Sequence, residues 1–287
     1  MNYKKENERK LKQLNRHRNI KGWVGGIFLI AVCFLTLFAP VIAPYDPYEQ
    51  ELASIFVKPF THSAVSDKFF LLGTDQLGRD ILSRILYGGR VSLALSLAAV
   101  LVSLIIGTIL GIMAGYYRGK TDVVIMRLAD IQLSIPTMLF AILIIAVMGA
   151  SLTNTIIVLA ITGWVPFTRV VRSEVLALRE QEFIESAKAM GVSNFRIILT
   201  HILPNITYTL ITQATLRIAQ MIMLAASLSF MGLGVNISMP TWGGMISDGR
   251  NYIYDAWWLS TFPGITIALV IFMIAIFSEW MQARTEK

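Results

Sequence analysis

The sequence predicts an all-α integral membrane protein with six transmembrane helices. Three observations lead to this fold class. Hydrophobic residues make up 55% of the 287 residues, the mean hydropathy is +0.63, and only 15% are charged, which is too few to cover a soluble domain. The apolar residues gather in runs of about 20 or more, the length of a membrane-crossing helix. Lys and Arg are distributed unequally between the intervening segments.

The first elements are a basic segment and an apolar run. Residues 1–21 carry eight Lys or Arg. Residues 22–44 exceed the apolar core of a secretory signal peptide and are followed by more spans, so we expect a first transmembrane helix there. A polar segment, residues 45–89, separates it from a membrane core, residues 90–281, and a short tail, residues 282–287. Within the core, five spans are expected near residues 90–116, 123–149, 153–172, 204–234 and 259–281.

The basic residues predict the orientation. With the N-terminus placed in the cytoplasm, 17 Lys and Arg fall in segments expected inside and six in segments expected outside. Because cytoplasmic loops are enriched in Lys and Arg, both termini and the loop 173–203 are predicted to be cytoplasmic, and residues 45–89 extracytoplasmic. We therefore expect a multi-pass protein of the cytoplasmic (inner) membrane, surrounded by lipid bilayer. This topology also explains the net charge of +7, so no nucleic-acid partner is expected.

Residue types and motifs that usually serve in catalysis, metal binding or nucleotide binding are sparse. Cys33 is the one cysteine, and the three histidines lie far apart in the chain, so neither a disulfide nor a metal site is expected. The stretch Ala114–Thr121 is close to a phosphate-binding loop, but Ala114 stands where that pattern needs glycine, and no strand precedes it. We expect no catalytic residue and no cofactor or nucleotide bound by this chain.

The loop 173–203 contains two predicted short helices. Good helix formers run from Arg179 to Ala189, and Gly191 is placed to end that helix with a positive φ. A polar residue after it can cap a second helix from Phe195 to His201. Pro204 then opens the fifth span, where a missing N–H costs little. Three apolar side chains of this loop could face a soluble partner: Phe183, Phe195 and Ile198.

The spacing in this loop resembles the EAA loop of ABC importer permeases. In that pattern Glu-Ala-Ala is followed after three residues by Gly, and nine residues later by Ile-x-Leu-Pro; His201 here replaces the isoleucine. In that family the loop docks in a cleft of the ATP-hydrolysing subunit and transmits its motion. The resemblance therefore implies an ATPase-coupling role for Glu185, Ser186, Ala187, Gly191, Leu203 and Pro204.

Further motifs narrow the resemblance to permeases for dipeptides, oligopeptides and nickel. The signature-like stretches are Leu72–Asp80, Ala43–Pro47, Tyr116–Asp122, Ser227–Gly234 and Trp242–Met245. Ala225 stands where the family commonly has glutamate, and Ser278–Arg284 replaces the usual ending. These two departures weaken any transfer of substrate identity from a close relative.

The resemblance implies the fold of a type I ABC importer permease, MetI-like, with one extra N-terminal helix. It implies a non-catalytic subunit that forms the path for di- or oligopeptides. The implied partners are a homologous second permease, two ATP-binding subunits that hold ATP and Mg, and an extracytoplasmic substrate-binding protein. The same architecture importing nickel or a metal chelate stays open as an alternative.

The fifth span carries a polar stripe. Its members recur at helical spacing: Thr209, Gln213, Arg217 and Gln220. A charge deep in a span normally faces a cavity or the bundle interior. Either the stripe lines the substrate path, with Arg217 meeting an anionic group such as a peptide carboxylate, or Arg217 pairs with an acid of a neighbouring subunit. The sequence leaves both hypotheses open.

Two smaller features of the spans predict packing. Gly107, Gly111 and Gly115 have the small-residue spacing of closely packed helices. Arg127 and Asp130, three residues apart at the start of the third span, are expected to form a structural ion pair.

Two other classes of function fit the sequence less well than the permease. An ion-coupled secondary transporter often has inverted repeats and a carboxylate at mid-membrane, but no repeat is visible and the candidate carboxylates are not mid-span. An intramembrane hydrolase needs a nucleophile and base, or metal ligands, within its spans, and no predicted span contains histidine.

Overall fold

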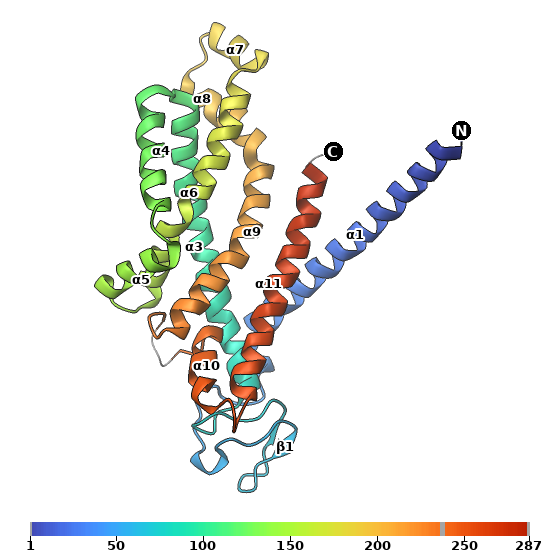
Figure 1. The fold of residues 1–287 in the computed structure, drawn as a ribbon, viewed down its shortest axis with the longest axis vertical. Helices are drawn as coiled ribbons and strands as arrows, with labels where there is room; N and C mark the ends of the chain where they lie inside the picture. Colours follow the sequence, from blue (N-terminus) through green and yellow to red (C-terminus); the bar gives the residue numbers. More distant parts are fainter. Residues whose placement is uncertain (1, 236–238, 286–287) are drawn as a thin grey trace. The chain divides into compact units, whose positions relative to one another are not determined.

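The computed structural model describes residues 2–235 and 239–285, with side chains for residues 19–235 and 239–283. The described chain is predominantly helical (Figure 1). The segment between α2 and α3 consists mostly of turns and loops, and it contains a small antiparallel hairpin of β1 (Thr61–His62) and β2 (Phe69–Phe70). The described residues form two compact units: a first unit of residues 2–93, 229–232 and 239–285, and a second unit of residues 94–228 and 233–235.

Several helices are long and apolar enough to cross a membrane, which confirms the predicted fold class. In the described residues there are five such stretches, and a bent helix pair makes a possible sixth span. The five are Asn19–Leu37, Ile81–Tyr117, Leu152–Arg179, Asn194–Phe230 and Trp258–Ala283.

The third span, predicted as one helix over residues 123–149, is divided in two. Helix α4 (Gly119–Leu133) and helix α5 (Thr137–Met148) meet at an angle of 90°. Pro136 lies at the break with an extended backbone, φ −54° and ψ 124°. Proline has no N–H to continue the helical ladder and disfavours the helical conformation in the residue before it, so the apolar run bends here.

In the first unit, helix α1 (Asn2–Leu37) packs against helix α11 (Trp258–Thr285). α1 extends well upstream of the predicted boundary at residue 22; the side chains of residues 1–18 lie outside the described part, as do residues 286–287 of the tail. The indole of Trp280 lies where Gly22 has no side chain, since a Cβ there would be 2.1 Å from Trp280 Cγ. The same indole donates a hydrogen bond to Asn19 Oδ1 at 3.1 Å.

The remaining elements of the first unit surround the start of helix α3 (Ile81–Tyr117). They are the short helices α2 (Ala39–Ile42), η1 (Leu52–Ser54), α10 (Trp242–Gly249) and η3 (Arg250–Tyr252). Asp80 caps α3, because its Oδ2 accepts a hydrogen bond from Ser83 N at 2.7 Å. The buried core of this region consists of Ile81, Ile85, Met245, Ala256, Trp258 and Leu259.

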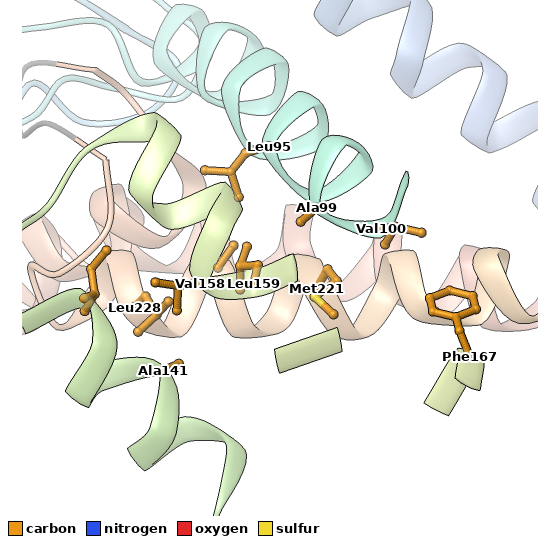
Figure 2. Close-up of a cluster of buried hydrophobic side chains, with 11 residues drawn as sticks. Leu95, Ala99, Val100, Ala141, Val158, Leu159, Phe167, Met221 and Leu228 are labelled. Carbon is orange, nitrogen blue, oxygen red and sulfur yellow. The ribbon is translucent and has the colours of Figure 1, made fainter. Parts of the chain in front are cut away.

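In the second unit, α3 packs closely on helix α6 (Leu152–Arg179), as the glycine spacing predicted. A Cβ on Gly107 would lie 2.5 Å from Phe167 Cβ, and one on Gly111 would lie 2.6 Å from Val171 Cβ. Figure 2 shows the adjoining core, to which α3, α5, α6 and helix α9 (Leu203–Phe230) contribute. Its labelled members are Leu95, Ala99, Val100, Ala141, Val158, Leu159, Phe167, Met221 and Leu228.

Candidate functional site

The loop after α6 contains a short helix that ends as the sequence predicts. α6 stops at Arg179, and helix α7 (Glu182–Ala189) follows, so the predicted helix 179–189 begins three residues later. Gly191 has a φ of +77°. Its N–H donates to Lys188 O at 2.9 Å, and the N–H of Val192 donates to Ala187 O at 3.1 Å. These two bonds are the pattern of a Schellman motif, which a left-handed glycine makes possible.

The predicted end of the second short helix at His201 is wrong. Helix α8 (Asn194–Ile197) continues through a π-helical turn, η2 (Ile198–Ile202), into α9, so the backbone is helical from Asn194 to Phe230. Pro204 cannot donate an N–H, and its ring would clash with the carbonyl of the residue four positions earlier. A wider π turn just before the proline relieves that clash without ending the helix.

The loop is held by a hydrophobic core of its own. Ile184 and Ala187 of α7, together with Ile197 and Ile202, are buried. They pack against the last turns of α3 and the C-terminal part of α6 in a single cluster. The loop is therefore a folded element on the end of these helices, as its position in Figure 1 illustrates.

Tyr116, near the end of α3, fastens the loop with polar contacts. Its hydroxyl donates to Asn194 Oδ1 at 2.8 Å, and its main-chain oxygen accepts a hydrogen bond from the guanidinium of Arg179. The centre of its ring lies 5.8 Å from Arg179 Cζ and 5.5 Å from Lys188 Nζ. Both cations are thus within range of the ring's negative face. Sequence reasoning gave Tyr116 no role, although the stretch that contains it was already noted as family-like.

Three ion pairs join α4 and its preceding turn to α6 and the turn after it. Arg172 binds both carboxylate oxygens of Asp122, at 2.5 and 2.6 Å. Arg118 pairs with Glu180 at 2.5 Å and Arg169 with Asp130 at 2.6 Å. These contacts fix the direction of α4 along α6.

The predicted pairing of Arg127 with Asp130 is wrong, because Asp130 pairs with Arg169 from the neighbouring helix. Arg127 is exposed. Local spacing suggested the first pair, but the packed arrangement brings a better-placed cation within 2.6 Å.

The outer surface of the loop carries three large exposed apolar side chains. Phe183, Met190 and Phe195 are 44%, 76% and 72% exposed. Ile198, predicted to share this face, instead packs against the loop's core. Large exposed apolar side chains on a well-supported element mark a contact surface.

The six motif residues divide between the exposed surface of the loop and its core. Glu185 and Ser186 are exposed on α7, and Gly191 and Pro204 are exposed at the turn and at the start of α9. Ala187 is buried, and Leu203 packs against the loop's core from a half-buried position.

The polar stripe on α9 lies away from the second unit's core. Thr209, Gln213 and Arg217 are half-buried, and Gln220 is exposed. Arg217 Nη1 donates to Gln220 Oε1 at 2.5 Å, so the end of the stripe forms one polar contact. The opposite face of α9 supplies core residues such as Met221 and Leu228.

In the part of the chain that the structure describes, no three His, Cys, Asp or Glu side chains gather in a group that could hold a metal ion.

Comparison with known proteins gives two family matches. Residues 107–287 match the family described as binding-protein-dependent transport system inner membrane component. Residues 17–59 match the N-terminal TM domain of oligopeptide transport permease C.

Curated relatives extend over most of the chain. A di/tripeptide transport system permease protein of Pseudomonas aeruginosa is 39% identical over 91% of this chain and 86% of its own length. A dipeptide transport system permease protein of Alkalihalophilus pseudofirmus is 43% identical over 86% of this chain and 79% of its own.

Among solved structures, the fold is similar to that of a chain of the MetNI methionine ABC transporter in an inward-facing conformation. The TM-score is 0.59 and the sequence identity 17%, over 71% of this chain and 97% of that one. This likeness shows the fold, and it confirms the predicted MetI-like architecture.

Proposed function

The chain belongs to the family of binding-protein-dependent transport system inner membrane components, and from that premise we propose that it forms the translocation path for di- or oligopeptides. Members of this family are non-catalytic permease subunits of ABC importers in the membrane. The peptide substrate rests on the two relatives, which carry peptide-transport names and align with most of this chain.

We propose that the loop around α7 and α8 transmits the motion of ATPase subunits, which hold ATP and Mg. The observation that carries this proposal is the apolar face of Phe183, Met190 and Phe195 on a loop with its own buried core. An exposed apolar face favours a protein partner, and a rigid support allows a push on the loop to reach the membrane helices. The charge of Glu185 on the same short helix can meet basic groups of that partner.

The stripe on α9 is proposed as one wall of the path. It faces away from the core of its own unit, so a second chain is needed to enclose a channel around it. A homologous second permease fits that need, with two ATP-binding subunits on the proposed cytoplasmic loops and a substrate-binding protein outside. Both termini are proposed to be cytoplasmic, from the bias in Lys and Arg.

Two variants of the loop test its role in the assembled transporter. Gly191→Val forces a β-branched residue into a left-handed conformation at a cost of about 1–2 kcal/mol or more. Glu185→Lys reverses an exposed charge. We expect both variants to insert normally, because insertion depends on the apolar spans. Less of the ATPase subunits should co-purify with them, or ATP hydrolysis should be uncoupled from peptide uptake.

The matched control is Gly149→Val. Gly149 also has a positive φ, +81°, and open space around it, but it ends α5 and lies outside the loop. Co-purification, peptide-stimulated ATPase activity and peptide uptake would be measured in reconstituted membranes. Full stimulation and uptake in both loop variants would contradict the coupling role. If the intact complex takes up nickel but no peptides, the proposal that peptides are the substrate is contradicted.

A further inference from the structure

The stretch Leu72–Asp80, which the transport function leaves without a role, is a tightly folded turn in the first unit. Gly73 and Gly78 have φ values of +83° and +72°. A Cβ on Gly73 would lie 2.6 Å from Val57 O, and one on Gly78 would lie 2.0 Å from Glu51 O. The turn therefore needs glycine at both positions, for its conformation and for its close approach to neighbouring backbone.

Four charged side chains gather beside this turn. Asp75 Oδ2 lies 2.7 Å from Arg79 Nε and 3.5 Å from Arg84 Nε. Asp248 Oδ2, on α10, lies 3.4 Å from Arg84 Nη2 and 3.9 Å from Arg79 Nη2. The side chains of Asp75 and Arg84 are only 6% and 5% exposed. The side chain of Asp248 is 40% exposed. Two arginines thus face two aspartates, which balances the charges of the buried Asp75 and Arg84.

Two polar atoms at this cluster are buried without a hydrogen-bond partner among the described residues: Arg84 Nη1 and Gln76 Oε1. Both side chains line one cavity of about 10 Å³, together with Asp75, Ile81, Met245, Asp248 and Leu259. The guanidinium nitrogen can only donate a hydrogen bond, and the amide oxygen can only accept one.

We propose that this cavity binds one water molecule, which accepts a hydrogen bond from Arg84 Nη1 and donates one to Gln76 Oε1. The volume fits a single water, and a buried water normally has two to four polar partners. The balanced charges favour a neutral ligand, because a cation would meet the guanidinium groups and an anion would meet the carboxylates.

An ion pair of Arg84 joins the water site to Asp248 of α10. Arg84 and Asp248 are 164 residues apart in the chain. α10 in turn holds the last residues of α9, because Ser247 Oγ donates to Phe230 O at 2.7 Å. The charge cluster and this hydrogen bond thus join α10 both to the turn and to Phe230.

The direct test is a structure of the complete transporter at a resolution that shows ordered water. We expect density within hydrogen-bonding distance of both Arg84 Nη1 and Gln76 Oε1, about 2.7–3.2 Å. A cavity without density, or density with the anomalous signal or coordination distances of an ion, would overturn the proposal.

A second test uses Gln76→Leu, which removes the acceptor and leaves the water and Arg84 Nη1 under-satisfied. We expect amide hydrogen exchange in residues 72–80 and 242–249 of the assembled complex to accelerate about tenfold, the effect of about 1.4 kcal/mol in a local opening equilibrium. Gln50→Leu is the matched control, because Gln50 is exposed in the same segment. Unchanged exchange in Gln76→Leu, or equal acceleration in Gln50→Leu, would overturn the proposal. Neither test measures transport, so the outcomes of both tests are independent of the proposed function.

Discussion

Replacing Tyr116 by phenylalanine removes one hydroxyl from the contact between α3 and the loop and leaves the rest in place. The hydroxyl donates to Asn194 Oδ1 at 2.8 Å, and the residue is only 5% exposed. A hydrogen bond of this kind contributes about 0.5–1.5 kcal/mol net. The ring contacts with Arg179 and Lys188 should persist, because phenylalanine also attracts cations. The loop's opening equilibrium should therefore shift by about twofold to tenfold.

Hydrogen exchange of the amides in α7 and α8 measures this shift in the assembled transporter. Tyr116→Phe should accelerate exchange there by the same twofold to tenfold and lower the ratio of peptide taken up to ATP hydrolysed. Tyr117→Phe is the control, since Tyr117 is the next residue but its side chain is 54% exposed. If Tyr116→Phe exchanges at the wild-type rate, the hydroxyl does not hold the loop and the reasoning fails.

Three further variants test packing, titration and the path. Gly107→Ala places a Cβ 2.5 Å from a side-chain carbon of α6, so we expect a loss of about 1–3 kcal/mol in unfolding experiments in detergent, absent in Gly264→Ala, where the space is open. Burial raises the pKa of the Asp80 carboxyl above its usual value of 3.8. The contribution of this shift to the stability of the folded protein is therefore complete below pH 3.8, and it is lost as the pH rises through the raised pKa. Asp80→Asn should keep the helix cap and flatten this part of the pH dependence of thermal stability. Arg217→Ala should lower peptide uptake about tenfold with assembly intact, whereas failure to join a partner permease would show that Arg217 is a structural contact to that subunit.

The partners in ion pairs could not be predicted from the sequence. Arg127 and Asp130 are three residues apart, and that spacing alone suggested an ion pair. In the packed protein Asp130 pairs with Arg169, 39 residues away, and the cluster of Arg84 and Asp248 spans 164 residues. A side chain chooses among all cations within a few ångströms after folding, and chain separation gives no measure of those distances.

Helix boundaries show the same division between local and tertiary causes. Gly191 was predicted to take a positive φ, and it does, because the end of a short helix and the freedom of glycine are properties of a few consecutive residues. Pro136 and Pro204 have the same local chemistry but different outcomes: the first accompanies a 90° bend and the second follows a π turn inside a continuous helix. The local chemistry of proline therefore does not by itself distinguish the two outcomes.

The sequence by itself determined the membrane class, most of the spans, the loop motif and the close packing at Gly107, because hydropathy and residue spacing act along the chain over tens of residues or fewer. Only the tertiary structure decided that Tyr116 holds the loop against α3, and that the Leu72–Asp80 turn shares a charge cluster with α10. These contacts join segments distant in sequence, and their energies depend on burial and on distances of a few ångströms, which exist only once the helices have packed.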